Sequence, residues 1–488
     1  MKSLAKIFFC GAAIFGMTVL FSSCTDTNEP EPGPEKPDMV GQSIFVPNEM
    51  NAEVTVSMEF EADDWTISNT NTWMDVYPYS GNAGVQEITV EVLGLNEELT
   101  ERVAGFMVKD NGSNIQYYVI QDPVAGWNIT SRTASVSGEA QSYTFSVQGN
   151  LDFEAVVAEG VDWLTIDSIT ESDSSLLADN ATYSAYRTYN INMSIAANDG
   201  EEVRTAEITL NGVDGVTTET IEVSQMGELV ADFSREFLRR SVVLKITGNW
   251  CGWCPSMSQA VHDAMEQYPN HIELINMYTN SQGLTFSDIT TFERLFGTGG
   301  GAPYSCVNYY AEVPLYSSIS VTTQAFVRVA NEASSTEELK SNSVLGGIAS
   351  LDGNTVTAKV NVATKEAGSY YVSAFLLEDG VIGQQDDYAG IVSDTRNYEH
   401  NDIARALMTE PFEDAYEFSA EGNQVLTFSV EVPSSVQNED NLHVVVFVAK
   451  EGTFSGSVSN ADYSDFGYVV DNVVDIPVGG FAIFEYEN

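Results

Sequence analysis

Two cysteines three positions apart carry most of the chemistry that this sequence could perform. Cys251 and Cys254 stand in the run Trp250-Cys251-Gly252-Trp253-Cys254-Pro255. A pair at this spacing can form and break a disulfide, or it can supply two thiolate ligands to zinc. The chain has no second ligand pair at a matching spacing, so the redox interpretation is favoured. We expect neither a metal nor a cofactor.

The residues around this pair predict a strand, a helix and a second strand. The apolar runs 242–246 and 272–277 are typical of buried strands. Between them, apolar residues recur every three or four positions from 257 to 268, which predicts a helix with one apolar face. Cys251 would then lie where the helix begins, and the unpaired N–H groups there stabilise a thiolate.

This order of elements resembles the thioredoxin-like oxidoreductases over residues 229–345. The resemblance implies an α/β domain in which Cys251 is the nucleophile and Cys254 the resolving thiol. It also implies that Pro303, in Gly301-Ala302-Pro303, is a cis-proline that packs against the disulfide.

Four further residues are candidate modulators of the pair. Lys245 stands where thioredoxins place a buried acid, six residues before the first cysteine, and a cation there would favour the thiolate and raise the reduction potential. Trp250 and Trp253 flank the leading cysteine. Cys306 is either a buried core residue or a third redox partner.

The composition excludes several classes of partner. The chain has 488 residues, enough for several domains, and 43% of them are hydrophobic, so packed cores are expected. Lys and Arg total 20 against 71 Asp and Glu, which gives a net charge of −51. This balance argues against nucleic acid and against an electrostatic hold on anionic lipid, because both require a basic face. Five cysteines are too few for a disulfide scaffold.

Residues 1–23 have the pattern of an export signal. Basic residues precede an apolar run, 7–21, that is short for a membrane span. Ser22-Ser23-Cys24 resembles the processing site of bacterial lipoproteins, which implies cleavage before Cys24 and acylation of its thiol; an ordinary secretory signal is the alternative. The acidic, proline-rich residues 24–39 predict an extended tether.

Acidic residues soon after the lipidated cysteine resemble the surface-export signals of Bacteroidetes lipoproteins. We therefore expect a protein held at the outer membrane by lipid alone, with the cell surface favoured over the periplasmic face.

Residues 40–123 and 124–228 predict two all-β sandwiches that repeat one pattern. Alternating apolar and polar residues with Gly and Asn turns indicate antiparallel strands. Trp73 and Arg102 of the first segment correspond to Trp163 and Arg204 of the second.

The run Pro78-Tyr79-Ser80-Gly81 after Trp73, with the closing Gln121-Asp122-Pro123, resembles the BACON module. The family name implies association with carbohydrate. In that interpretation exposed aromatic residues such as Trp65 or Tyr79 stack on sugars. In the alternative interpretation the tryptophans at 73 and 163 are core residues and both modules are spacers.

Residues 346–488 predict a C-terminal β-sandwich, with strands at 355–362, 369–377, 424–432, 443–449 and 468–476. Between these strands lies Tyr398-Glu399-His400-Asn401-Asp402-Ile403-Ala404-Arg405. This run, downstream of the CxxC segment, resembles the Bacteroidetes outer-membrane twenty-eight-kilodalton lipoprotein family over residues 230–488. His400, Asn401 and Arg405 could form a binding site, or a buried hydrogen-bonded corner that joins strands.

The sequence therefore leaves two functions open. The first is thiol–disulfide exchange on exported or extracellular proteins, with protein thiols or disulfides as partners. The second is adhesion to glycans or mucin glycoprotein, with a disulfide that is only structural.

Overall fold

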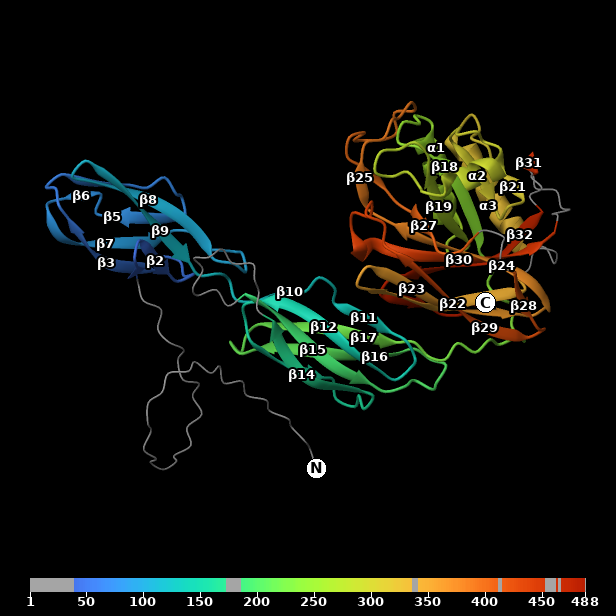
Figure 1. The fold of residues 1–488 in the computed structure, drawn as a ribbon, viewed down its shortest axis with the longest axis horizontal. Helices are drawn as coiled ribbons and strands as arrows, with labels where there is room; N and C mark the ends of the chain where they lie inside the picture. Colours follow the sequence, from blue (N-terminus) through green and yellow to red (C-terminus); the bar gives the residue numbers. More distant parts are fainter. Residues whose placement is uncertain are drawn as a thin grey trace. The chain divides into compact units, whose positions relative to one another are not determined.

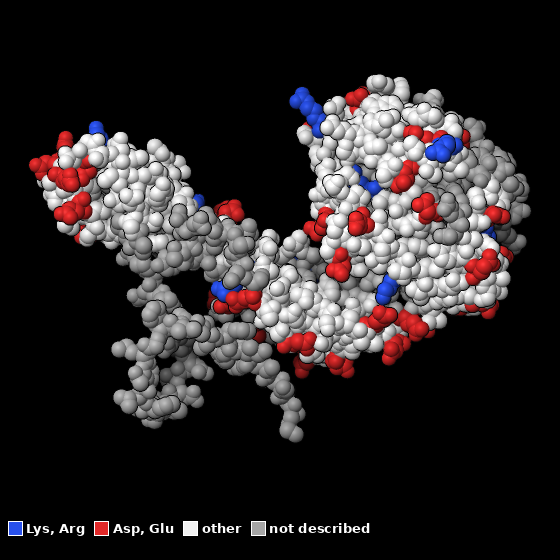
Figure 2. Space-filling view, in the orientation of Figure 1, with Lys and Arg blue, Asp and Glu red and all other residues white. Residues whose placement is uncertain are grey.

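The structure is a computed structural model that describes residues 39–172, 186–335, 341–410, 415–452, 462–463 and 467–487. The predicted signal peptide, nearly all of the predicted tether and Cys24 lie outside these residues. The chain divides into two compact units, Met1–Val124 and Ala125–Asn488. In the described part of the chain, no helix has the length and apolarity needed to cross a membrane. Acidic side chains are spread over the visible face of both units (Figure 2), in keeping with the net charge.

The first unit is a β-sandwich of a six-stranded and a three-stranded sheet (Figure 1). Buried and exposed residues alternate along its strands, as in Glu53–Phe60, because one face of each sheet packs on the core and the other meets solvent. The six-stranded sheet has the order β1-β2-β9-β8-β4-β6 and the other β3-β7-β5. The strands are β1 (Met39–Val40), β2 (Ser43–Val46), β3 (Glu53–Phe60), β4 (Trp65–Ser68), β5 (Met74–Tyr77), β6 (Ser80–Gly81), β7 (Gly84–Val92), β8 (Arg102–Asp110) and β9 (Ser113–Gln121).

The second unit begins with another sandwich, made of two four-stranded sheets. Their orders are β10-β12-β15-β14 and β11-β17-β16-β13. Both sandwiches share one feature of topology: the second strand pairs in parallel with the last strand. These pairs are β2 with β9 in the first sandwich and β11 with β17 in the second. The strands are β10 (Trp127–Asn128), β11 (Thr133–Val136), β12 (Gln141–Gly149), β13 (Phe153–Val157), β14 (Leu164–Ser172), β15 (Arg187–Ile195), β16 (Arg204–Gly212) and β17 (Thr218–Gln225).

A three-residue lock recurs in both sandwiches and explains their shared sequence pattern. In the first, the guanidinium of Arg102 lies 4.5 Å from the Trp73 ring centroid, and its Nε donates to Gln121 Oε1 over 3.0 Å. The second sandwich repeats this arrangement. The guanidinium of Arg204 lies 4.5 Å from the Trp163 ring centroid, and its Nε donates to Gln225 Oε1 over 2.9 Å. Each arginine also donates to backbone carbonyls, so the lock ties together three stretches of chain.

The remaining chain, from β18 onward, is built on one ten-stranded mixed sheet. Its order is β31-β21-β20-β18-β19-β27-β24-β30-β32, and β28 also pairs with β24. A four-stranded sheet, β29-β23-β22-β33, packs on one face of β24 and β30 through a shared core (Figure 1). A short β25–β26 hairpin completes the set.

These strands are β18 (Ser241–Thr247), β19 (Ile272–Tyr278), β20 (Tyr304–Val307), β21 (Ala311–Glu312), β22 (Ser343–Asp352), β23 (Thr355–Thr364), β24 (Gly368–Glu378), β25 (Val381–Gly383), β26 (Tyr398–His400), β27 (Ile403–Leu407), β28 (Ala415–Phe418), β29 (Gly422–Glu431), β30 (Leu442–Glu451), β31 (Asp462–Tyr463), β32 (Tyr468–Pro477) and β33 (Gly480–Ala482), with a short 3₁₀ turn, η2, at Glu439–Asn441.

Three α-helices in the described residues cover the sheet around β18: α1 (Cys254–Gln267), α2 (Ile289–Phe296) and α3 (Ile319–Ser335). Helices α1 and α3 share a core with Val243, whereas α2 packs on the opposite face with Val242, Leu244 and Ile246. All seven residues of β18 are buried, as expected for a strand covered on both faces.

The predicted fold class is wrong: the described residues form no distinct α/β thioredoxin-like domain over 229–345, and 346–488 is not a separate sandwich. Strand β27 lies between β19 and β24, so strands of both segments belong to one sheet. One core cluster likewise contains Leu244 and Met277 together with Phe375 and Phe447. The two segments share a sheet for a physical reason. Strand β19 is buried along nearly its whole length, and pairing with β27 covers the edge that a separate domain would leave open.

The local predictions within this region are confirmed. The strand, helix and strand around the cysteine pair are β18, α1 and β19. The five strands expected after residue 346 correspond to β23, β24, β29, β30 and β32.

Candidate functional site

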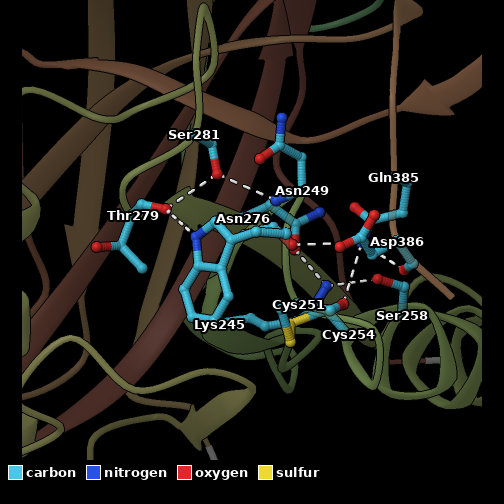
Figure 3. Close-up of a disulfide and its surroundings, with 12 residues drawn as sticks. Lys245, Asn249, Cys251, Cys254, Ser258, Asn276, Thr279, Ser281, Gln385 and Asp386 are labelled. Carbon is cyan, nitrogen blue, oxygen red and sulfur yellow. Dashed lines mark hydrogen bonds between the residues drawn. A yellow bond between two sulfur atoms is a disulfide. The ribbon is translucent and has the colours of Figure 1, made fainter. Parts of the chain in front are cut away.

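The two cysteines form a disulfide at the start of α1 (Figure 3). Strand β18 ends at Thr247, and a tight loop holds the pair because Cys251 N donates to Gly248 O and Cys254 N donates to Cys251 O. Cys251 is 5% exposed and Cys254 is 1% exposed. Both cysteines are therefore buried, Cys251 slightly less than Cys254.

Trp250 and Trp253 flank the disulfide and are both exposed. The indole Nε1 of Trp250 donates to Thr279 O over 3.0 Å, which fixes this ring against the end of β19. Trp253 packs edge-on against Tyr388, with ring centroids 5.8 Å apart. The surface around the pair is thus aromatic.

Lys245 is fully buried on β18, on the face that carries α1. Its Nζ donates to Ser258 Oγ of α1 and, over 2.9 Å, to Asn276 Oδ1 of β19 (Figure 3). Burial lowers the pKa of Lys245 to about 7, while the Asp402 carboxylate acts in the opposite direction. The group therefore titrates near neutral pH.

A segment from the later part of the chain covers the cysteine loop. We call residues 384–397, between β25 and β26, the covering segment. The side chain of Gln385 donates from Nε2 to Cys251 O over 3.1 Å and to Gly248 O over 3.3 Å. Asp386 N and Tyr388 N each donate over 2.7 Å to backbone carbonyls of the cysteine loop. A Cβ on Gly252 would lie 2.4 Å from the Tyr388 ring, so only glycine allows this approach.

A polar cavity of about 310 Å³ opens between α1 and the covering segment. On the helix side it is lined by Pro255, Gln259 and His262, starting one residue after the disulfide. On the other side it is lined by residues between Ile391 and Glu399.

Pro303 and Cys306 lie just before and within β20, which pairs with the edge of β18 opposite β19. The Ala302–Pro303 peptide is cis, and β20 begins at the next residue, Tyr304, which pairs with Ile246. Pro303 is thus beside the end of β18 that leads into the cysteine loop. Cys306 is fully buried opposite Leu244, in the core beneath α2, which is the environment of a core cysteine.

His400, Asn401 and Arg405 are brought together as a buried corner around β27. His400 Nδ1 lies 2.7 Å from Tyr278 Oη, and burial lowers the pKa of this histidine to about 4. Asn401 accepts at its backbone oxygen from Asn276 Nδ2. Arg405 pairs with the buried Glu378 over 2.7 Å and donates to Gly283 O. These contacts hold β27 between its two neighbours.

The aromatic residues proposed for sugar stacking differ in exposure. Trp65 is 0% exposed, stacks on Phe60, and donates from Nε1 to Asn82 O, so it cannot serve as a stacking platform. This corrects the expectation for Trp65. Tyr79 is 56% exposed, and its hydroxyl donates to Asp75 Oδ2 over 2.7 Å, which holds the ring at the surface.

Sequence reasoning missed the residues that contact the cysteine loop but lie far from it in the sequence. Gln385 and Tyr388 lie more than 130 positions beyond Cys251, and no local periodicity links them to it. Ser258 and Asn276, which accept hydrogen bonds from Lys245, lie on elements that the sequence predicted. The sequence did not show that these side chains face Lys245.

Two family models match parts of this chain. Residues 310–463 match the family described as "Outer membrane protein Omp28", and residues 153–226 match the BACON family, described as "Putative binding domain, N-terminal". The BACON match lies in the second sandwich, although the motif that suggested this family lies in the first. No match was found among curated protein sequences.

Three solved structures show limited similarity. HBP35 of Porphyromonas gingivalis is 13% identical, with a TM-score of 0.37, over 50% of this chain and 76% of that one. Protein AGR_C_4864 of Agrobacterium tumefaciens is 12% identical, with a TM-score of 0.30, over 49% of this chain and 94% of that one. A GH5 xyloglucanase of Bacteroides ovatus is 17% identical, with a TM-score of 0.15, over 20% of each chain. Because all three TM-scores are below 0.5, these similarities assign no activity to this chain.

The family name of the longer match points to the outer membrane. Residues 310–463 are thus similar to the Omp28 outer membrane protein family, and residues 153–226 are similar to the BACON domain.

Proposed function

We propose that the Cys251–Cys254 pair carries out thiol–disulfide exchange on exported or extracellular proteins. The observation that carries this proposal is the disulfide at the start of α1, with Cys251 as its less buried residue and a buried lysine on the adjoining strand. Helix α1 begins at Cys254 and not at Cys251 as expected, so its dipole favours negative charge on Cys254, the sulfur that leaves when Cys251 is attacked.

The proposed exchange runs through a mixed disulfide. A partner thiolate attacks Cys251 Sγ, a new S–S bond forms, and the bond to Cys254 breaks to give the Cys254 thiolate. A second partner thiolate then attacks the partner's sulfur in the mixed disulfide and releases the Cys251 thiolate. The partner leaves with a disulfide and the protein with two thiols; the reverse sequence reduces a partner disulfide.

The covering segment restricts access to this reaction. Its hydrogen bonds to the cysteine loop and the Tyr388 ring over Gly252 leave little of Cys251 exposed. In our proposal a partner displaces part of the segment, and the exposed Trp250 and Trp253 supply apolar contact for its chain.

We further propose that the β-sandwiches associate with carbohydrate or mucin glycoprotein. The BACON match in the second sandwich supports this role, and the exposed Tyr79 of the first offers a ring fixed beside a carboxylate. Aromatic faces next to hydrogen-bonding groups suit sugar rings.

We also propose that Cys24 carries a lipid and that the protein is anchored at the cell surface of the outer membrane. The Ser-Ser-Cys run at positions 22–24 and the acidic tether after it support this placement.

The first prediction concerns the reduction potential of the pair. We expect a value between about −120 and −270 mV, the span of catalytic couples, when the full chain is equilibrated in graded glutathione buffers and its thiols are trapped by alkylation. Cys306→Ser should give the same value. A potential below about −300 mV would mark a structural disulfide and refute the exchange proposal.

Lys245→Met should lower that potential when it is measured at pH 6. Below its pKa of about 7 the lysine is mostly protonated and stabilises the thiolate of the reduced form, so its loss favours the disulfide. Lys359→Met removes an exposed lysine and serves as the control. Equal potentials for both variants would exclude an electrostatic role for Lys245.

Gln385→Ala should speed reduction of the disulfide by a protein dithiol several-fold, because it removes two hydrogen bonds that hold the covering segment on the cysteine loop. Ile391→Ala, an exposed change in the same segment, should leave the rate unchanged. The rates follow from stopped-flow tryptophan fluorescence, and identical rates for both variants would show that the segment does not limit access.

Tyr79→Ala should reduce retention of the full chain on immobilised mucin, because it removes an exposed ring held by Asp75. Val85→Ala shortens an even more exposed apolar side chain of the same sandwich and should have no effect. Unchanged retention of the Tyr79 variant, or no retention of the wild type, contradicts glycan association through this residue.

Cys24→Ser should abolish incorporation of labelled palmitate and release the protein from membranes. Continued labelling of this variant in cells would rule out acylation at Cys24.

A further inference from the structure

One polar cluster supplies no reacting group to the proposed exchange, although its Asp402 also acts on Lys245. Asp379, Asp402 and His443 each offer one ligand atom, and these atoms all lie within 4.8 Å of one another. Neither the CxxC chemistry nor the carbohydrate proposal uses them, and neither matched family description assigns them a role.

The sheet register explains why residues so far apart in sequence meet here. Glu378 at the end of β24 pairs with Ile403 of β27 on one side and with Leu442 of β30 on the other. Asp379 follows the end of β24 and Asp402 precedes the start of β27, whereas His443 lies within β30, opposite Leu377. Asp402 N donates to Asp379 Oδ1 over 2.7 Å, which holds the Asp379 carboxylate beside the backbone of residue 402.

His443 is oriented toward the cluster as a metal ligand would be. Its residue is only 8% exposed, and its Nδ1 lies 2.8 Å from Asp475 Oδ1. Its Nε2 makes no hydrogen bond and lies 3.5 Å from Asp379 Oδ1. A carboxylate on one ring nitrogen, with the other nitrogen facing the Asp379 carboxylate, is the arrangement that orients histidine ligands in metal sites.

The local charge favours a divalent cation beside His443. The carboxylates of Asp379 and Asp402 lie on one side of its ring, and the carboxylate of Asp475 lies 2.8 Å from Nδ1. His262 of α1, whose Nε2 lies 3.9 Å from Asp402 Oδ2, adds a second imidazole at the edge of the cluster.

We propose that Asp379, Asp402 and His443 form a site for one divalent transition-metal cation, with Zn²⁺ as the ion that their donors fit best. One imidazole nitrogen and two carboxylate oxygens suit Zn²⁺, whereas Ca²⁺ prefers six to eight oxygen ligands. Zn–N and Zn–O bonds of about 2.0–2.2 Å require donors about 3.3–3.5 Å apart. The two carboxylates, which are partly exposed, must therefore rotate inward while His443 stays fixed.

The bound ion would neutralise two of the three carboxylates that converge on His443. It would also clamp β24, β27 and β30 at the end of the sheet nearest the covering segment, since β25 follows Asp379 and β26 precedes Asp402 within a few residues.

The test is a calorimetric titration of the chelator-treated full chain with ZnCl₂, in its disulfide form so that Cys251 and Cys254 offer no thiolate. We expect one tight site above the weak background binding of an acidic surface. Asp379→Asn and Asp402→Asn should each lower its affinity at least tenfold. Asparagine keeps the oxygen that accepts the 2.7 Å hydrogen bond at position 379 and tolerates the φ of +53° at position 402, so both variants should fold.

The matched control is Asp440→Asn, an exposed carboxylate of the η2 turn in the same corner, which should bind zinc as the wild type does. Asp475→Asn, which acts only through His443, should weaken binding by about 10–100-fold. A tight zinc site that survives both cluster variants, the absence of any tight site, or calcium binding as strong as zinc binding would each overturn the proposal.

Discussion

The insertion of β27 between β19 and β24 is the constraint on which the second unit depends. The strand is only five residues long, and its register with β19 consists of the single pair Asn276–Ile403. Side chains compensate for this short contact. The Tyr278–His400 and Asn276–Asn401 hydrogen bonds hold one edge, and the buried Arg405–Glu378 pair holds the other. Breaking a buried pair of this kind costs about 3–5 kcal/mol, because it leaves an uncompensated charge.

The consequences of that insertion reach the disulfide. Strand β27 is preceded by the β25–β26 hairpin, whose connecting residues form the covering segment. Fixing β27 against β19 therefore brings Gln385 and Tyr388 to the cysteine loop. The residues that cover the cysteine loop thus come from a distant part of the sequence, in the connection of the two-stranded β25–β26 sheet.

The sequence predicted the elements around the cysteines well, because their signals are local. The helix starting at Cys254 follows from apolar spacing, and β18 follows from a continuous apolar run. It did not predict that these elements share a sheet with β24 and β30, because strand partners far apart in sequence leave no periodic trace. The resemblance to thioredoxin-like proteins favoured the wrong prediction of a separate domain, since a strand–CxxC–helix–strand unit commonly belongs to one. Trp65 was misjudged for a related reason: alternation in β4 fixes which residues share a face, but not which face is buried.

The lock formed by Trp73, Arg102 and Gln121, and again by Trp163, Arg204 and Gln225, has a consequence for how such chains change over evolution. Each lock lies wholly within the strands and loops of its own sandwich. A copy of the gene segment that encodes one sandwich thus brings its own closure and needs no compensating change in its neighbour. Duplication or loss of such a segment alters the number of sandwiches while leaving the sheet that carries the disulfide untouched.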